Sequence, residues 1–527
     1  MSQGFRQSQA VLHTWSGLVV GWVLYLIFIA GTASYWRPEL TRWMQPELGL
    51  PPPAALALDQ AQAFLARTAP DATRWVIELP GSRSSATTVR WQPKDAPEPK
   101  RGQPNPYHAT LDAHGQPVQA RDTRGGDFFY RLHFDLHYVP ALWARWFVCF
   151  CTMFMLVAIV SGVITHKKIF ADFFTFRRTK GQRTWLDGHN ALAVLSLPFH
   201  LMITYTGLIT LMTVYMPWAV EANFGSRDAF FAELFPREAK VEPRGEHAAP
   251  PRLAALLDTA GAAWGNGHAA SVVVDQPGDA AMRITLRRDS GDRIADNGEP
   301  LRFDARGALQ GEGAVRSAAV FTRDGMIGLH AARFAPTTLR WLFFLSGVAG
   351  TLMVATGLVL WTVKRREQLP DPTRPHRAFR FVERMNIGFV AGLPVAMLAF
   401  LWGNRLLPMA LENRSKAEIS VFFLTWTLCL LHAGVRLPRR AWVEQLALAG
   451  ALAVLLPVFN AVVWNGGLFH AFATGNQAVG GIDLGLLLLG VALLWAARKV
   501  HRHVPVPRRA RTSRTAPAAA AVAEAGA

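Results

Sequence analysis

Hydrophobic residues along the chain gather into eight long runs separated by polar stretches. A membrane-spanning helix needs about 20 predominantly apolar residues. The runs at 18–36, 142–164, 191–214, 341–363, 387–407, 419–437, 446–464 and 482–497 meet or approach this length. The first run has a long apolar core and only Arg6 as a leading charge, which favours an uncleaved anchor over a secretory signal peptide. The pattern predicts eight transmembrane helices.

Basic clusters set the expected orientation of these helices. Lys and Arg gather directly after the second, fourth, sixth and eighth runs, and cytoplasmic loops carry such an excess. All four clusters fall on one side if both termini are cytoplasmic, as in a multi-pass protein of a bacterial inner membrane. The predicted segments are transmembrane helices at 1–36, 139–166, 189–216 and 339–363, cytoplasmic basic loops at 167–188 and 364–383, outward domains at 37–138 and 217–338, four additional transmembrane helices within 384–500, and a disordered cytoplasmic tail at 501–527.

Composition agrees with a membrane protein that also carries polar domains. Of 527 residues, 51% are apolar and 17% are charged, below the roughly 25% typical of soluble domains. A soluble enzyme and a disordered chain are therefore disfavoured, and the 3 cysteines, all inside apolar runs, are too few for a disulfide framework. The net charge of +18 comes largely from the clusters beside the spans, so it predicts a lipid bilayer as partner and no nucleic acid.

The first four runs form two copies of one helix–domain–helix unit. His13 precedes Gly31 by the same spacing that separates His189 from Gly207. Each outward domain begins with an amphipathic run, continues with strand-like alternation and contains an Asp-Ala-X-Gly turn. Such a parallel repeat implies a pseudo-twofold axis along the membrane normal. We expect a mainly α-helical membrane protein with two α+β domains outside the membrane.

Several of the 16 histidines lie at membrane depth, where ionisable side chains usually mark function. The candidates in or beside the first four runs are His13, His137, His166, His189, His200 and His330, with His133 near His137. Imidazole is a common axial ligand of haem iron. His189 and His200 are 11 residues apart, which on one helix leaves a rotation of about 20° and a rise of about 16 Å, so both would project from one face at two depths.

These positions predict two haems stacked across the bilayer. His13, His166 and His189 form a cluster on the cytoplasmic side, and the repeat-related His137 and His330 could share an iron on the outer side. The sequence has no Cys-X-X-Cys-His motif, so we expect non-covalent haem b. A single interfacial histidine more often has a structural role, and zinc is a weaker alternative because no carboxylates or thiolates gather near these histidines.

Two arginines and a set of glycines have two interpretations each. Arg145 and Arg340 each precede a tryptophan near the outer ends of the second and fourth runs. They fit an aromatic belt at the membrane surface, or a clamp on haem propionates or another anion, because the guanidinium fork suits carboxylates. Glycines such as Gly162 and Gly357 predict close helix packing and also leave room for a flat macrocycle.

The chain resembles the family of PepSY-associated transmembrane proteins over about residues 8–366. The residues that carry the resemblance are His13-Thr-Trp-Ser-Gly17, Leu136-His137, Ser161-Gly162 with His166, Asp187-Gly-His189, Thr206-Gly207 and Leu329-His330. The resemblance implies that the outward domains are periplasmic PepSY-like modules. It also implies that haem ligands are among the six candidate histidines, with their pairing open. The four additional helices are a departure from the four-span members.

That family includes ferric-siderophore reductases of bacterial inner membranes, which hold b-type haems between these helices. The resemblance implies a haem-dependent oxidoreductase that passes electrons to a periplasmic ferric siderophore or other ferric chelate. No Gly-X-Gly-X-X-Gly motif follows a predicted strand, which favours an external electron donor, a quinol or a cytoplasmic reductase. The alternatives are a non-enzymatic scaffold that binds peptides or restrains a protease, and a transporter, against which the first four runs lack a broken-helix signature.

Overall fold

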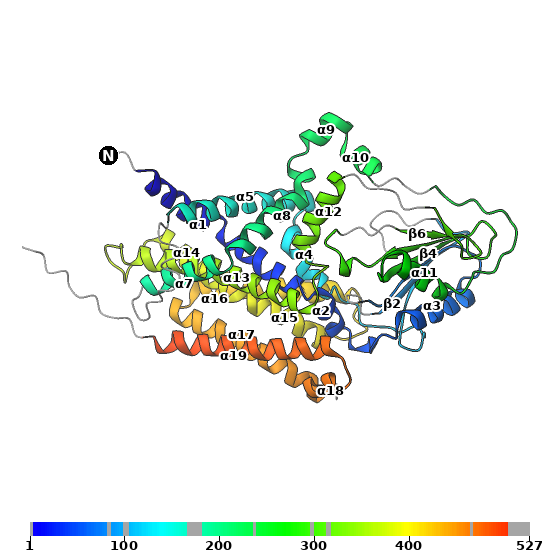
Figure 1. Cartoon of the computed structure of the whole chain (residues 1–527). Helices are drawn as coiled ribbons and strands as arrows, with labels where there is room; N and C mark the ends of the chain where they lie inside the picture. The colour runs from blue at the N-terminus through cyan, green and yellow to red at the C-terminus, as the bar shows by residue number, and fades with distance from the viewer. Residues whose placement is uncertain are drawn as a thin grey trace, which may run out of the picture.

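The computed structural model describes residues 4–81, 86–97, 105–165, 182–234, 239–295, 300–311, 318–463 and 467–503. The eight predicted spans are confirmed within these residues. They are α1 (Phe5–Ser34), α5 (Ala141–Thr165), α8 (Leu197–Tyr215), α13 (Thr337–Arg366), α14 with α15 (Arg377–Val390 and Gly392–Leu406), α16 (Arg414–Val435), α17 (Pro438–Val463) and α19 (Gln477–Arg502). A β-sheet lies at one end of this bundle, the sheet side, while α1 begins and α19 ends at the opposite end, the far side (Figure 1).

The third span is interrupted where the sequence predicted one continuous helix. α7 (Gln182–Leu195) and α8 are separated by Ser196, whose backbone has φ −106° and ψ 13°. Pro198 follows in the first turn of α8; a proline cannot donate a backbone hydrogen bond, and its ring clashes with the carbonyl group four residues earlier, here that of Val194, so the helix is disrupted just before the proline. The predicted absence of a break in the first four spans is therefore wrong. The rotation and rise calculated for His189 and His200 assumed an unbroken helix and do not apply across this interruption, although both residues line one cavity.

Both outward modules contribute to one antiparallel sheet, which the sequence did not predict. Its strand order is β3-β2-β1-β4-β5-β6-β7. The strands are β1 (Ala72–Glu78), β2 (Thr87–Pro93), β3 (His108–Leu111), β4 (Ala269–Asp275), β5 (Arg283–Arg288), β6 (Leu301–Phe303) and β7 (Leu309–Gln310). β1 of the first module pairs with β4 of the second, with Val76 opposite Val273. The two modules are thus joined at the middle of the sheet.

One hydrophobic core lies beneath this sheet. Trp75 and Ile77 of β1 and Val272 and Val274 of β4 are buried, because alternate side chains of a strand point to the same face. The helices α3 (Ala54–Thr68), η2 (Leu253–Ala255) and α11 (Leu256–Ala263) contribute to the same core. Since both modules share it, they form a single unit outside the bundle.

Short helices connect the sheet with the spans. They are α2 (Arg37–Met44), η1 (Pro46–Leu48), α4 (Asp127–Asp135), α9 (Trp218–Phe224), α10 (Arg227–Leu234) and α12 (Ala318–Ala331). Two further short helices lie elsewhere: η3 (Ser290–Asp292) between β5 and β6, and α18 (Leu468–Ala473) between α17 and α19. α4 packs against α1 and α5, and α12 packs against α8. In each module, the segment that follows the strands therefore returns to the membrane helices before the next span begins.

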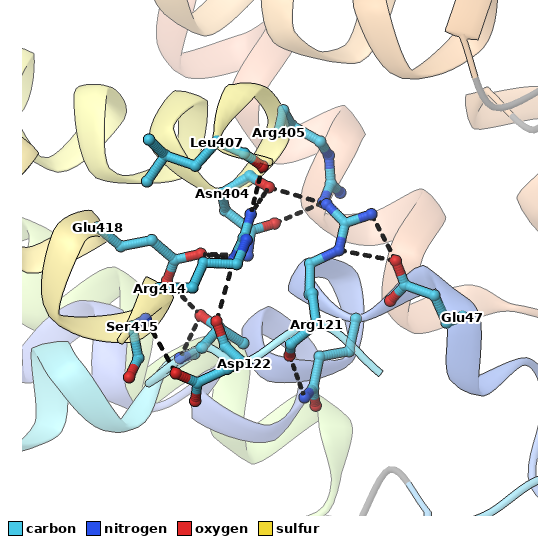
Figure 2. A network of polar contacts seen from close by, with 12 residues as sticks. Glu47, Arg121, Asp122, Asn404, Arg405, Leu407, Arg414, Ser415 and Glu418 are labelled. Atoms are coloured by element: carbon cyan, nitrogen blue, oxygen red, sulfur yellow. Dashed lines mark hydrogen bonds and ion pairs between the residues drawn. The ribbon is translucent and has the colours of Figure 1, made fainter. Parts of the chain in front are cut away.

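A buried ionic network fixes α15 and α16, which belong to two of the four additional spans, to the loop before α4. Arg414 and Glu418 of α16 form an ion pair in which neither side chain is exposed. Arg414 also donates to the carbonyl oxygens of Asn404 at 2.6 Å and Asp122 at 3.1 Å, and Thr123 donates to Glu418 (Figure 2). Buried charges are tolerated only with such partners. The network therefore fixes this loop, and α4 after it, against α15 and α16.

Candidate functional site

Two pairs of histidines face each other between the helices. On the far side, His13 of α1 and His189 of α7 have ring centroids 6.3 Å apart. On the sheet side, His133 of α4 and His330 of α12 have ring centroids 6.0 Å apart. We call these the far-side pair and the sheet-side pair. Each pair takes one histidine from each copy of the repeat.

Each of these rings is held by a backbone carbonyl of a neighbouring helix. The distance from Nδ1 to the carbonyl oxygen is 2.9 Å from His13 to Ala158, 2.9 Å from His189 to Met353, 2.6 Å from His133 to Ile27 and 3.1 Å from His330 to Ile203. Because a carbonyl oxygen can only accept, Nδ1 carries the proton and donates it. Nε2 then keeps the lone pair that a metal ligand needs, and the hydrogen bond sets the ring orientation.

A glycine lies four residues after each of these carbonyls, on the same face of its helix. The four are Gly162 beside His13, Gly357 beside His189, Gly31 beside His133 and Gly207 beside His330. A Cβ at these positions would come within 2.7 to 3.1 Å of ring atoms, closer than ordinary van der Waals contact. The sequence predicted close helix packing at such glycines, and the structure shows that what packs there is the imidazole ring.

Each histidine pair lines a cavity. The far-side cavity has a volume of about 560 Å³ and the sheet-side cavity about 830 Å³, both within the roughly 300–1,000 Å³ of sites that bury small ligands and cofactors. Leu24 and Met155 line both cavities. The two cavities therefore adjoin each other along the bundle.

The two pairs fit an iron held between imidazoles. Two metal–nitrogen bonds of about 2 Å, each followed by about 1 Å to the ring centre, place ring centroids about 6 Å apart. In the part of the chain that the structure describes, no three His, Cys, Asp or Glu side chains gather as ligands for a bare metal ion. A haem brings its own equatorial nitrogens and takes axial ligands from the protein. The residues present therefore fit this cofactor better than a bare ion.

Burial keeps the sheet-side pair in its neutral form. It lowers the pKa of His133, and burial together with the proximity of His133 lowers the pKa of His330 to about 3. A neutral imidazole is the form that binds a metal. Near neutral pH both rings can therefore act as ligands.

His137 does not belong to the sheet-side pair, which corrects the prediction that it shares an iron with His330. α4 ends at Asp135, and the three residues that follow have positive φ angles. The ring of His137 stacks instead on Phe423 of α16, with centroids 5.5 Å apart. His133, one helical turn earlier, takes the place facing His330. The sequence offered a signal for His133, because Leu132-His133 is a Leu-His dipeptide like Leu136-His137 and Leu329-His330.

One further predicted ligand, His200, lies outside the pairs. His200 of α8 is buried and lines the far-side cavity, but its ring neighbours are Phe28 and Phe199 rather than a second histidine. His166 lies outside the described residues. The predicted cytoplasmic-side cluster is thus represented in the structure by His13 and His189.

The two predicted arginines already have acidic partners. Arg145 lines the sheet-side cavity and forms an ion pair with Asp135 at 2.8 Å. Arg340 lines neither cavity; it forms an ion pair with Glu39 at 2.6 Å and lies 4.4 Å from the ring centroid of Trp36. Arg340 therefore does not fit the predicted clamp on a cofactor, and Arg145 reaches its cavity with its charge already compensated.

Comparison with known proteins adds two findings. The family described as the PepSY-associated TM region matches residues 10–364, a range that includes both histidine pairs. An uncharacterized protein of Pseudomonas aeruginosa, PA4219, is 28% identical over 291 residues, which cover 49% of this chain and 67% of that protein. The family match ends before the four additional spans.

Proposed function

The chain belongs to the family of the PepSY-associated TM region, and from this premise we propose that it is a haem-containing membrane oxidoreductase that carries electrons to a ferric chelate. The observation that carries the proposal is the pair of facing imidazoles at each of two depths, with Nδ1 of each ring bound to a carbonyl oxygen. A structural role for isolated histidines does not require rings that face each other across a cavity.

The chain's own residues would bind and orient the cofactor. Haem b at each pair supplies reversible one-electron chemistry when bound. Nε2 of each imidazole is the ligand atom, and the Nδ1 hydrogen bond holds the ring orientation and raises the basicity of the ligand. Leu24 and Met155 form an apolar wall common to both cavities, which keeps water out of the space between the two sites.

The proposed direction follows from the placement of charges. We infer that the far side, where basic clusters follow the spans, is the cytoplasmic side, and that the sheet lies in the periplasm of a bacterial inner membrane. A quinol or a cytoplasmic reductase would then donate electrons on the far side. On the sheet side, each electron would convert one Fe(III) of a ferric siderophore or another ferric chelate to Fe(II), which the chelator holds more weakly.

Visible spectroscopy of the detergent-purified full chain tests this proposal. The protein reduced with dithionite should show the sharp α-band of six-coordinate haem b, and a ferric siderophore should reoxidise it with one electron per Fe(III). His133→Ala and His189→Ala should each remove one haem and leave the other. A folded but colourless protein, as expected for a PepSY scaffold or a transporter, contradicts the proposal.

A further inference from the structure

Positive charge lines the far-side cavity, and none of the described residues in its wall is acidic. Lys364 and Arg365, in the last turn of α13, line the cavity together with His13 and His189. No Asp or Glu of the described residues lines it. The sheet-side cavity differs, because Glu78 and Asp289 are among its lining residues and Arg145 in its wall is paired with Asp135.

Arg365 is held in place by two indole rings. Its guanidinium carbon lies 5.8 Å from the ring centroid of Trp15 and 5.5 Å from that of Trp361, and both tryptophans line the cavity. Such cation–π contacts orient a guanidinium without neutralising its charge. The next residue, Arg366, instead forms an ion pair with Glu383 of α14 and does not line the cavity.

Trp361 adds a hydrogen-bond donor to the same place. Its Nε1 is buried and has no hydrogen-bond partner among the described residues. An indole N–H can only donate, and leaving a buried donor unpaired is costly. Together Trp361, Lys364 and Arg365 form a group of donors, which we call the basic corner, and no carboxylate of the described residues lines the cavity beside them.

We propose that the basic corner binds the propionate carboxylates of the haem held by His13 and His189, an inference that rests on the proposed function. The guanidinium fork of Arg365 and the indole N–H of Trp361 match carboxylate oxygens. The haem in this cavity is thereby oriented with its acidic edge toward the far side of the bundle. Neither Arg145 nor Arg340, the two arginines singled out from the sequence, lines this cavity.

The spacing along α13 agrees with this assignment. Gly357, against which His189 packs, is eight residues before Arg365, about 12 Å along the helix axis. Side chains of a helix lean toward its N-terminus, so the Arg365 side chain extends back toward the histidine pair. The contact with Trp361, one turn earlier, follows the same direction.

Haem and haem dimethyl ester, in which both propionates are blocked, distinguish this role from a purely structural one. The haem-depleted full chain is reconstituted with either compound in phosphatidylcholine nanodiscs, and the release of each to excess apomyoglobin is timed. The variants are Arg365→Gln and Trp361→Phe, which keeps an aromatic ring beside Arg365. The matched control is Arg366→Gln, which removes the same charge outside the cavity.

With haem, we expect Arg365→Gln and Trp361→Phe each to release one of two haems about tenfold faster than the unmodified chain does. This is the effect of losing one charge-assisted hydrogen bond. The control Arg366→Gln should release haem at the rate of the unmodified chain. With the dimethyl ester, all four proteins should release that haem at the same rapid rate. Equal retention of haem and ester by the unmodified chain overturns the inference while the proposed function stands.

An anionic lipid headgroup has the same chemistry as a propionate at this position. The release experiment is therefore repeated with phosphatidylglycerol added to the nanodiscs. An effect of Arg365→Gln that appears only with the anionic lipid assigns the guanidinium to lipid phosphate and overturns the inference. A chain that takes up neither haem nor its ester overturns the proposed function and this inference together.

Discussion

Replacing Gly31 with alanine would place a methyl group 2.7 Å from Cε1 and Nδ1 of His133. Ordinary contact begins near 3.4 Å, so the ring has to retreat by about 0.7 Å, more than the roughly 0.5 Å that a functional site tolerates. The retreat strains or breaks the 2.6 Å hydrogen bond from Nδ1 to Ile27. Loss of such an orienting bond lowers metal affinity by about 10- to 100-fold, or about 1.4–2.8 kcal/mol. We therefore expect the sheet-side haem to be lost preferentially.

Haem content of the purified Gly31→Ala protein, with its thermal unfolding, measures this effect. Alanine favours a helix over glycine by about 1 kcal/mol. The substitution therefore does not weaken α1, and the unfolding temperature of the haem-free chain should not fall for that reason. Gly485→Ala is the control, because a Cβ there meets no atom within 4 Å. Retention of two haems with unchanged low-spin spectra in Gly31→Ala would show that the glycine does not seat the ring.

Three other predictions follow from the structure. His137→Ala should retain both haems, whereas His133→Ala should lose one, and equal losses by pyridine haemochromogen assay would contradict the observed pairing. Glu418→Gln leaves Arg414 buried without its anion and should destabilise the protein by about 3–5 kcal/mol, whereas Glu444→Gln at an exposed ion pair should hardly change the unfolding temperature. The pKa of His330 is about 3 in the folded chain against 6.5 ordinarily, so the unfolded chain binds the proton first as pH falls. Stability of the haem-free protein should thus fall below about pH 6.5, and less so in His330→Leu.

The spans could be predicted from sequence because a bilayer demands a long apolar run and little else. The interruption at Ser196 was missed because the run stays apolar through it; Pro198 was the available signal. Pairing of β1 with β4 was not predictable from local pattern, because alternation within each strand shows which face is buried and not which strand lies beside it. The network around Arg414 and Glu418 was missed for a similar reason, since its partners lie far apart in the sequence.

The sequence predicted a site built from histidines, but it identified only some of the histidines that form the pairs. Repeat spacing identified His13, His189 and His330, which the structure places in pairs. The choice of His137 over His133 failed because two Leu-His dipeptides lie one turn apart and the end of α4 at Asp135 decides between them. The sequence also marked the glycines, but only the structure shows which ring lies against each.

The two copies of the repeat share every histidine pair, so neither copy possesses a complete ligand set. A pocket with exact twofold symmetry would bind a flat, asymmetric molecule equally well in two poses related by a 180° rotation. The offset that relates His13 to His189 also relates Leu24 to His200, and both line the far-side cavity. The far-side cavity is therefore not strictly twofold, because an imidazole lies where the other copy has an aliphatic side chain, and this difference would favour one of the two poses over the other.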